Sequence, residues 1–380
     1  MPHEVLTLQL GSFANYVGTH YWNFQDELLG LQEREDAVGA AAAQIDSGVL
    51  YRAGETARGQ PTFTPRLVAW DLSGALGGAS SRGSLYLEEG HLTAAGTWAG
   101  RHEVHRALPV ARSAFSCALE QEPEGPPPPQ AGNVMATAAG VAAAEALAAA
   151  ARALDGEGAV RYWTDYLKAH LHPRSLHQLP GVWEGGAPFD GWGDGAAYAA
   201  SAERREGMLE AVRFFAEEAD SLQGLQLFVD DLSGFGAIAA RLLPELREDL
   251  GPSLPVLLYA VRPSAAEPPG LELAALRRRR LGEALSLARL SQHASVATVV
   301  APPATPTALP LLRWLPERPF HTSALCAAAL DTATLPYRLA PGDGSPVGIG
   351  AREGSAAGSK RSCAGGRWGS SYAPWAGAPS

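Results

Sequence analysis

The sequence predicts an α/β fold with a mainly parallel sheet, because the chain twice runs from a strand through a glycine turn into a helix. In the first unit, within residues 3–30, an aliphatic strand reaches Gly11 and a helix follows. The second unit has a strand at 225–229, a turn at 230–236 and a helix at 237–246. Repeated strand and helix units of this order favour parallel strands with helices on both faces of the sheet.

The other elements are predicted from hydrophobic periodicity and composition. Met208, Val212, Phe215 and Ala219 recur at helical spacing, with charged residues on the opposite face. The same reasoning predicts strands at 67–70 and 255–261, helices at 160–167, 202–220 and 271–290, and a Gly- and Trp-rich loop at 181–198.

Composition divides the chain into four parts. Residues 1–119 form the first part of the predicted domain, and residues 159–339 form the remainder. Residues 120–158 contain four consecutive prolines and an alanine-rich run, so we expect an insertion or a disordered linker there. Residues 340–380 have almost no aliphatic side chains and are expected to be a disordered or aberrant tail.

Charge and cysteine content exclude several classes of function. The formal charge of −10 over 380 residues argues against a nucleic-acid-binding surface, which needs a basic face. The three cysteines, Cys117, Cys326 and Cys363, lie too far apart for a disulfide framework or a zinc site. His170 and His172 have no third ligand at metal-binding spacing, so we expect no metal site.

Targeting and membrane signals point to the cytosol. The first 33 residues contain no Lys or Arg but do contain acids, which argues against a secretory signal and an Arg-rich presequence. The uncharged run at 294–312 contains four prolines and cannot form a continuous spanning helix. We therefore expect no transmembrane segment, and any membrane contact would be peripheral.

The first glycine turn has the layout of a phosphate cradle, because a helix N-terminus follows it. Residues 11–18, GSFANYVG, resemble the tubulin turn G-Q-C-G-N-Q-I-G, with Gly11, Asn15 and Gly18 in matching places. Ser12 and Phe13 replace the Gln and Cys of that turn. Near residues 63–74 the chain again resembles tubulins, whose acidic turn there faces the metal of the nucleotide. Asp71 is kept, whereas Ser73 stands for the expected Glu, and residues 96–102 are similar to a further tubulin loop.

The second glycine turn resembles the tubulin signature that wraps the nucleotide phosphates, G-G-G-T-G-S-G. The approach at 219–227 is similar to C-D-x-L-Q-G-F-Q-L, which places the signature on residues 232–238. Gly234 and Gly236 are the glycines that remain, and Asp230 and Asp231 bring negative charge towards an anionic ligand. The resemblance implies a vestigial GTP site whose candidate residues are Gly11, Ser12, Asn15, Asp71, Ser233, Gly234 and Gly236.

A dinucleotide site is the alternative for this turn. Residues 234–239 fit the pattern G-x-G-x-x-A after a strand, but that pattern expects an acid at the end of the next strand. Arg262 stands there instead. The sequence therefore argues against NAD.

Two further segments narrow the resemblance. Residues 163–175, WTDYLKAHLHPRS, resemble a string typical of the Misato family of tubulin-like proteins, and residues 321–338 are similar to the central helix of tubulins. The resemblance implies a Rossmann-like nucleotide-binding domain of the tubulin/FtsZ type. We expect it to stop near Arg338, before the second domain and before the acidic loop that tubulins and FtsZ use for hydrolysis.

Two functions remain open from the sequence. The Misato resemblance implies a non-catalytic cytosolic protein, peripherally associated with the mitochondrial outer membrane, that acts with outer-membrane or fusion-machinery proteins in mitochondrial fusion, distribution and morphology. No cofactor is established, although GTP is possible. The alternative is a GTP-binding tubulin-like protein that polymerises or supports cytoskeletal organisation. Arg277 to Arg280 are interpreted as a solvated helix face, with an anionic-lipid or nucleic-acid patch as the less favoured reading.

Overall fold

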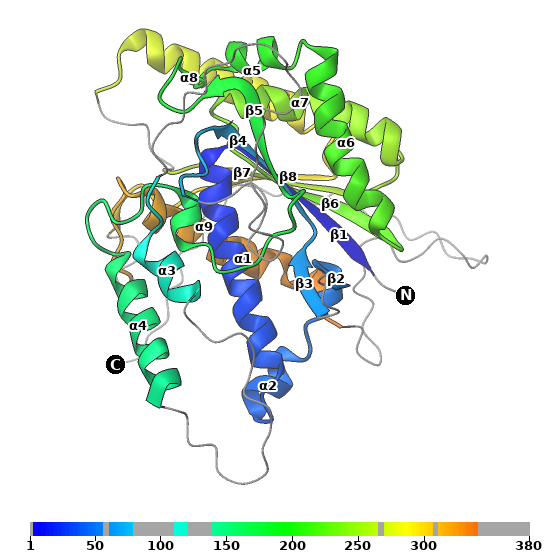
Figure 1. Ribbon diagram of the computed structural model, residues 1–380. Coiled ribbons are helices and arrows are strands. Elements are labelled where there is room, and N and C mark those ends of the chain that lie inside the picture. Colours follow the sequence, from blue (N-terminus) through cyan, green and yellow to red (C-terminus); the bar gives the residue numbers. More distant parts are fainter. Residues whose placement is uncertain are drawn as a thin grey trace, which may run out of the picture.

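The centre of the molecule is one six-stranded parallel sheet with strand order β5-β4-β1-β6-β7-β8 (Figure 1). The computed structural model describes residues 3–55, 61–78, 110–120, 138–264, 270–306 and 311–340. The strands are β1 Glu4–Leu10, β4 Leu67–Ser73, β5 Leu176–Trp183, β6 Leu222–Val229, β7 Val256–Val261 and β8 Val296–Val300. The predicted mainly parallel α/β fold is confirmed.

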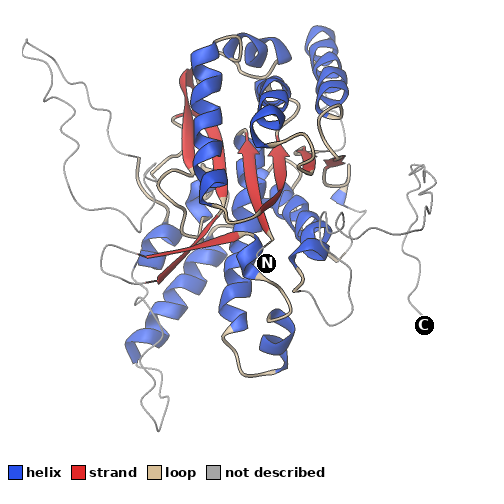
Figure 2. Cartoon of the chain, turned by 90° about the vertical axis from the view of Figure 1, so that its right-hand side faces the viewer, coloured by secondary structure: helices blue, strands red, loops and turns tan. Residues whose placement is uncertain are grey.

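Helices cover both faces of this sheet (Figures 1 and 2). One face carries α1 Ser12–Gln32 and α9 Pro319–Arg338, and the other carries α6 Ala202–Glu218 and α7 Gly234–Leu250. Two further helices, α5 Trp192–Tyr198 and α8 Leu273–Leu290, pack against α7.

Alternation along the strands divides the interior into two cores. Leu6, Leu8 and Leu10 of β1 point into the core beneath α6 and α7. Val5 points to the opposite face, into the core beneath α1 and α9. Because successive strand residues face opposite sides, a strand that is apolar on both faces is buried on both.

Smaller elements lie around the main sheet. Strands β2 Tyr51–Glu55 and β3 Pro61–Pro65 form an antiparallel pair, preceded by α2 Ala37–Ala42 and the 3₁₀ helix η1 Ser47–Val49. The helices α3 Ala114–Glu120 and α4 Ala138–Ala153 contact each other. In the described part of the chain, no helix is both long and apolar enough to cross a bilayer.

The structure corrects three expectations. The helix expected at 160–167 is only the 3₁₀ helix η3 Trp163–Tyr166, because the Asp165 carboxylate accepts the Arg161 and Tyr162 backbone N–H groups and closes a tight turn. The loop expected at 181–198 contains the end of β5 and all of α5. Within the expected linker, α4 is ordered and its Leu147 packs near Phe115. The segments 96–102 and 341–380 lie outside the described residues.

Candidate functional site

The predicted site residues gather at the carboxyl ends of neighbouring parallel strands. Gly11 follows β1, Asp71 lies near the end of β4, and Ser233 follows β6. The chain proceeds from β1 towards β4 and β5, then returns to β6 on the other side of β1. This is a topological switch point, the place where open α/β sheets bind ligands.

The first turn is closed by the second one. Gly11 has φ of 105°, and a Cβ there would lie 2.7 Å from Asp230 Cβ and 3.0 Å from the Phe235 ring. The Asp230 backbone N–H donates to the Leu10 carbonyl at 2.9 Å, which holds the two turns together. Gly11 therefore allows close contact between two protein segments.

Polar groups of the protein surround the Asp71 carboxylate. Asn15 Nδ2 donates to Asp71 Oδ2 at 3.0 Å, Trp163 Nε1 donates to the same oxygen at 2.9 Å, and the Leu72 N–H donates to Oδ1 at 2.8 Å. Burial raises the pKa of the Asp71 carboxyl to about 6, although these hydrogen bonds act in the opposite direction. Asp71 is thus bound by the protein itself, and Trp163 links it to the string that resembles Misato proteins.

The second turn is also filled by protein groups. The Gly234 N–H donates to the Phe189 carbonyl at 3.0 Å, and a Cβ on Gly234 would lie 2.5 Å from the Phe189 ring. Ser233 Oγ accepts the Phe235 N–H at 3.3 Å and caps α7. A Cβ on Gly236 would lie 2.6 Å from Ser286 Oγ, so this glycine allows α8 to approach.

Phe189 is the site residue that sequence reasoning missed. Its ring meets the Phe235 ring edge to face, with centroids 5.4 Å apart. Phe189 lies in the segment 184–191, which contains no other apolar residue larger than proline. A single aromatic residue in such a segment is the signal that could have identified it.

The acids near the second turn titrate abnormally or form ion pairs. Burial raises the pKa of the Asp230 carboxyl to about 7, and the charges of Asp231 and Asp71 contribute. Arg262 pairs with Asp231 at 2.6 Å and with Glu283 at 2.6 Å. Arg262, which stands where a dinucleotide site would have an acid, is therefore the counter-ion of Asp231 and Glu283.

The other candidates have varied surroundings. Ser12 is the first residue of α1 and is partly exposed, whereas Ser73 is buried and its hydroxyl donates to the Leu179 carbonyl at 3.0 Å. The described residues contain no group of three or more His, Cys, Asp or Glu side chains placed to hold a metal ion. His172 stacks on Phe214 with ring centroids 5.5 Å apart.

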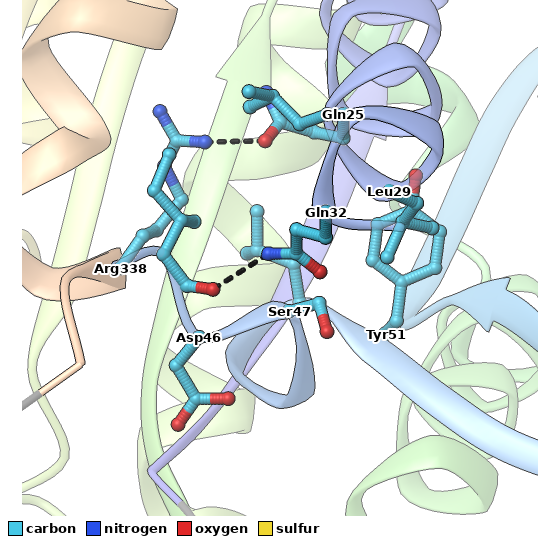
Figure 3. A pocket seen from close by; sticks show the side chains of 10 residues that line it. Gln25, Leu29, Gln32, Asp46, Ser47, Tyr51 and Arg338 are labelled. Atoms are coloured by element: carbon cyan, nitrogen blue, oxygen red, sulfur yellow. Dashed lines mark hydrogen bonds between the residues drawn. The ribbon is translucent and has the colours of Figure 1, made fainter. Parts of the chain in front are cut away.

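A small pocket with room for about one water molecule lies away from these turns, between α1, η1 and the end of α9 (Figure 3). Arg338, which is 1% exposed, donates to Gln25 Oε1 and, at 2.8 Å, to Asp331 Oδ1. Two of the pocket's polar atoms, Arg338 Nε and Tyr51 Oη, have no hydrogen-bond partner among the described residues. The Arg338 side chain, beside this pocket, therefore joins the end of α9 to α1.

Two family models match most of the chain. A model described as the Misato Segment II tubulin-like domain matches residues 3–121, and a tubulin domain model matches residues 153–339. The two models leave residues 122–152 unmatched, which is most of the segment 120–158 that was expected as a linker.

Curated relatives match over nearly all of this chain. It is 34% identical over 364 residues to Protein misato homolog 1 of Mus musculus, a match that covers 88% of this chain and 59% of that protein. It is 32% identical over 364 residues to the Homo sapiens protein of the same name, covering 91% and 61%. It is 30% identical over 341 residues to Protein dml1 of Aspergillus oryzae, covering 89% and 61%. The chain thus spans about three fifths of the length of these relatives, and it belongs to the Misato family of tubulin-like proteins.

Proposed function

We propose that this chain is a non-catalytic Misato-family protein of the cytosol that acts at the mitochondrial outer surface in mitochondrial fusion, distribution and morphology. Its partners are outer-membrane or fusion-machinery proteins, and its association with the membrane is peripheral. The mitochondrial part of the proposal is supported by membership of the Misato family, because the resemblance to that family implies a role in mitochondrial fusion, distribution and morphology. The closed glycine turns support the non-catalytic part.

Closure of the α7 N-terminus is the observation that carries the non-catalytic assignment. A phosphate bound at a helix N-terminus needs free backbone N–H groups and a close approach to the backbone. Here Gly234 gives its N–H to Phe189, and Phe235 gives its N–H to Ser233. Asp230 and Asp71 add acidic groups where a phosphate needs positive charge.

A GTP-binding, polymerising protein is the second candidate. Gly11, Asn15, Gly234 and Gly236 remain at tubulin-like places, and no side chain caps the N-terminus of α1. If nucleotide binds, Phe189 has to move away from Gly234.

Equilibrium binding of labelled GTP to the purified chain, with and without Mg²⁺, separates the two candidates. We expect no saturable binding even at millimolar nucleotide. Phe189→Ala, which removes the ring from Gly234, serves as the variant with an opened turn. Submicromolar binding by the wild-type chain would favour the second candidate and would contradict the closed turn on which the non-catalytic assignment rests.

The mitochondrial role is tested separately in cells. Depletion of the protein is expected to change mitochondrial network shape, and expression of the wild-type protein is expected to restore it. Restoration by a Ser12→Glu variant, which places a negative charge at the partly exposed N-terminus of α1 where a phosphate would bind, would support a role that needs no nucleotide. An unchanged network after depletion contradicts the mitochondrial proposal, whatever the outcome of the GTP measurement.

A further inference from the structure

The outward face of α8 combines arginine with exposed leucine and alanine. Gly282, Ser286 and Leu290 are buried on the inner side of this helix, at a spacing of four residues. Leu273 and Leu281 are 58% and 62% exposed on the other side. In an α-helix, residues near the direction opposite the buried line share one face. For α8 these are Leu273, Ala274, Arg277, Arg280, Leu281, Ala284, Leu287 and Ala288.

This face carries no acid, although the whole chain has a formal charge of −10. The acid within α8, Glu283, lies at the edge of the face and is paired with Arg262 at 2.6 Å and Arg280 at 3.1 Å. Within the described residues, no ion pair forms to Arg277, Arg278 or Arg279. The positive charge of this helix is therefore only partly neutralised by the protein.

Helix α6 provides the contrast on the same side of the sheet. Its exposed residues include Glu203, Glu206, Glu210 and Glu217, and it exposes no large apolar side chain. That is the ordinary composition of a solvated helix face. The face of α8 differs in both charge and hydrophobicity.

We propose that the outward face of α8 docks on a bilayer that contains anionic phospholipids. The guanidinium group of Arg277 on this face, and that of the exposed Arg278 at its edge, meet lipid phosphates, and Leu273 and Leu281 enter the boundary between headgroups and acyl chains. The inference deepens the proposed function and rests on it, because it supplies the contact through which a cytosolic protein reaches an organelle surface.

The chemistry of the face favours a membrane over other anionic partners. A helix that lies in the membrane interface needs apolar and cationic side chains mixed along one exposed line, as α8 has them. Nucleic acid is disfavoured because the face has no aromatic residue on which a base could stack. An acidic protein would pair with the arginines but would leave Leu273 and Leu281 exposed to water.

Co-sedimentation with vesicles tests the proposal. The purified chain is mixed with vesicles of phosphatidylcholine alone or with phosphatidylserine added. We expect binding to the anionic vesicles only, weakened by salt. Arg277→Gln/Arg278→Gln is expected to lower the partition coefficient by about fivefold for each arginine. Leu281→Gln is expected to lower it as well.

Two matched controls separate this face from general charge and hydrophobicity. Arg152→Gln/Arg241→Gln removes the same charge from exposed positions on α4 and α7, and Val38→Gln removes an apolar residue that is 49% exposed on α2. Both are expected to bind vesicles as the wild type does.

Three outcomes would overturn the inference: no binding to anionic vesicles, equal binding to both vesicle types, or equal losses in the controls and the α8 variants. A mitochondrial phenotype that persists in cells expressing only the Arg277→Gln/Arg278→Gln variant, with vesicle binding lost in vitro, would support both the lipid contact and its use in the mitochondrial role. Vesicle binding by the wild type with no change in the network after depletion would support the lipid contact and count against the mitochondrial role. Lost vesicle affinity with normal rescue of the network would show that α8 binds lipid but that the function does not depend on it.

Discussion

Asp230 faces Gly11 across the two turns, and its carboxyl titrates near neutrality. Its pKa is raised to about 7, so the folded state favours the protonated form more than the unfolded state does. The stabilising contribution is fully present below the unfolded pKa of about 4 and is lost as the pH rises through about 7. The carboxyl therefore makes the fold less stable at neutral pH than at mildly acidic pH.

The Asp230→Asn variant is predicted to be more stable than the wild type above pH 7, by on the order of 2 kcal/mol, and to differ little near pH 4. The amide keeps the shape of the side chain but cannot ionise. Urea denaturation at several pH values measures this difference, with Asp190→Asn, at an exposed position, as the control. A stability gain that is the same at every pH would disprove the raised pKa.

Arg338 is the second residue with a clear prediction. Its guanidinium is buried between Gln25 and Asp331, so removal of the charge leaves polar partners unpaired. Arg338→Met is predicted to lower the free energy of unfolding by about 3 kcal/mol. Arg241→Gln, at an exposed position, is the control and should have almost no effect. Equal stability of the two variants would mean that this cluster does not hold α9 to α1.

At the scale of elements, the contact between α5 and α7 depends on one glycine. A Cβ on Gly195 would lie 1.8 Å from the Gly234 carbonyl oxygen, which is backbone and cannot rotate away. Gly195→Ala is predicted to destabilise the protein by about 1–3 kcal/mol, because α5 must move.

The matched control lies in the same helix. A Cβ on Gly193 would meet nothing within 4 Å, so Gly193→Ala should be neutral or should stabilise by about 0.5–1 kcal/mol, from reduced freedom of the unfolded chain. Thermal or urea unfolding of both variants gives the comparison. If Gly193→Ala destabilises as much as Gly195→Ala, the close approach of Gly195 to Gly234 is not the cause, because helix propensity alone favours alanine at both positions.

The elements that could be predicted are those whose signal is local. Strands β1 and β6 and helices α6 and α7 follow from hydrophobic periodicity and from the glycine turns between them. The short helix α5 was missed because its glycines and its Trp192 indicate a loop when read without their packing partners. The helix expected at 160–167 failed for the opposite reason, since Asp165 bonds to the backbone and stops helix formation.

At the scale of the whole molecule, the sheet order brings together residues that are far apart in the sequence. Gly11, Asp71 and Ser233 were predicted as one site from the resemblance to tubulins. The sheet order places all three at the carboxyl ends of neighbouring parallel strands, which share an edge. The occupants of the site could not be predicted. Phe189 and Ser286 reach the turns from distant segments, and no local pattern reports such an approach.

Prediction of fold and prediction of ligand thus depend on different information. The chain keeps the periodicity and turns that build a tubulin-like domain, and these were sufficient to identify its architecture. Whether nucleotide enters the site depends on side chains such as Phe189, whose position is set by tertiary contacts. The candidate GTP residues therefore remain a prediction until binding is measured.

The contact of Phe189 with Gly234 has a consequence for timing in the cell. Proteins that hydrolyse GTP change state when the bound GTP is converted to GDP, and so the rate of hydrolysis limits the period for which they act. On the proposed function, a turn filled by its own chain keeps one shape whatever the cellular ratio of GTP to GDP. The duration of the protein's action would then be set by its synthesis, its degradation and the availability of its partners.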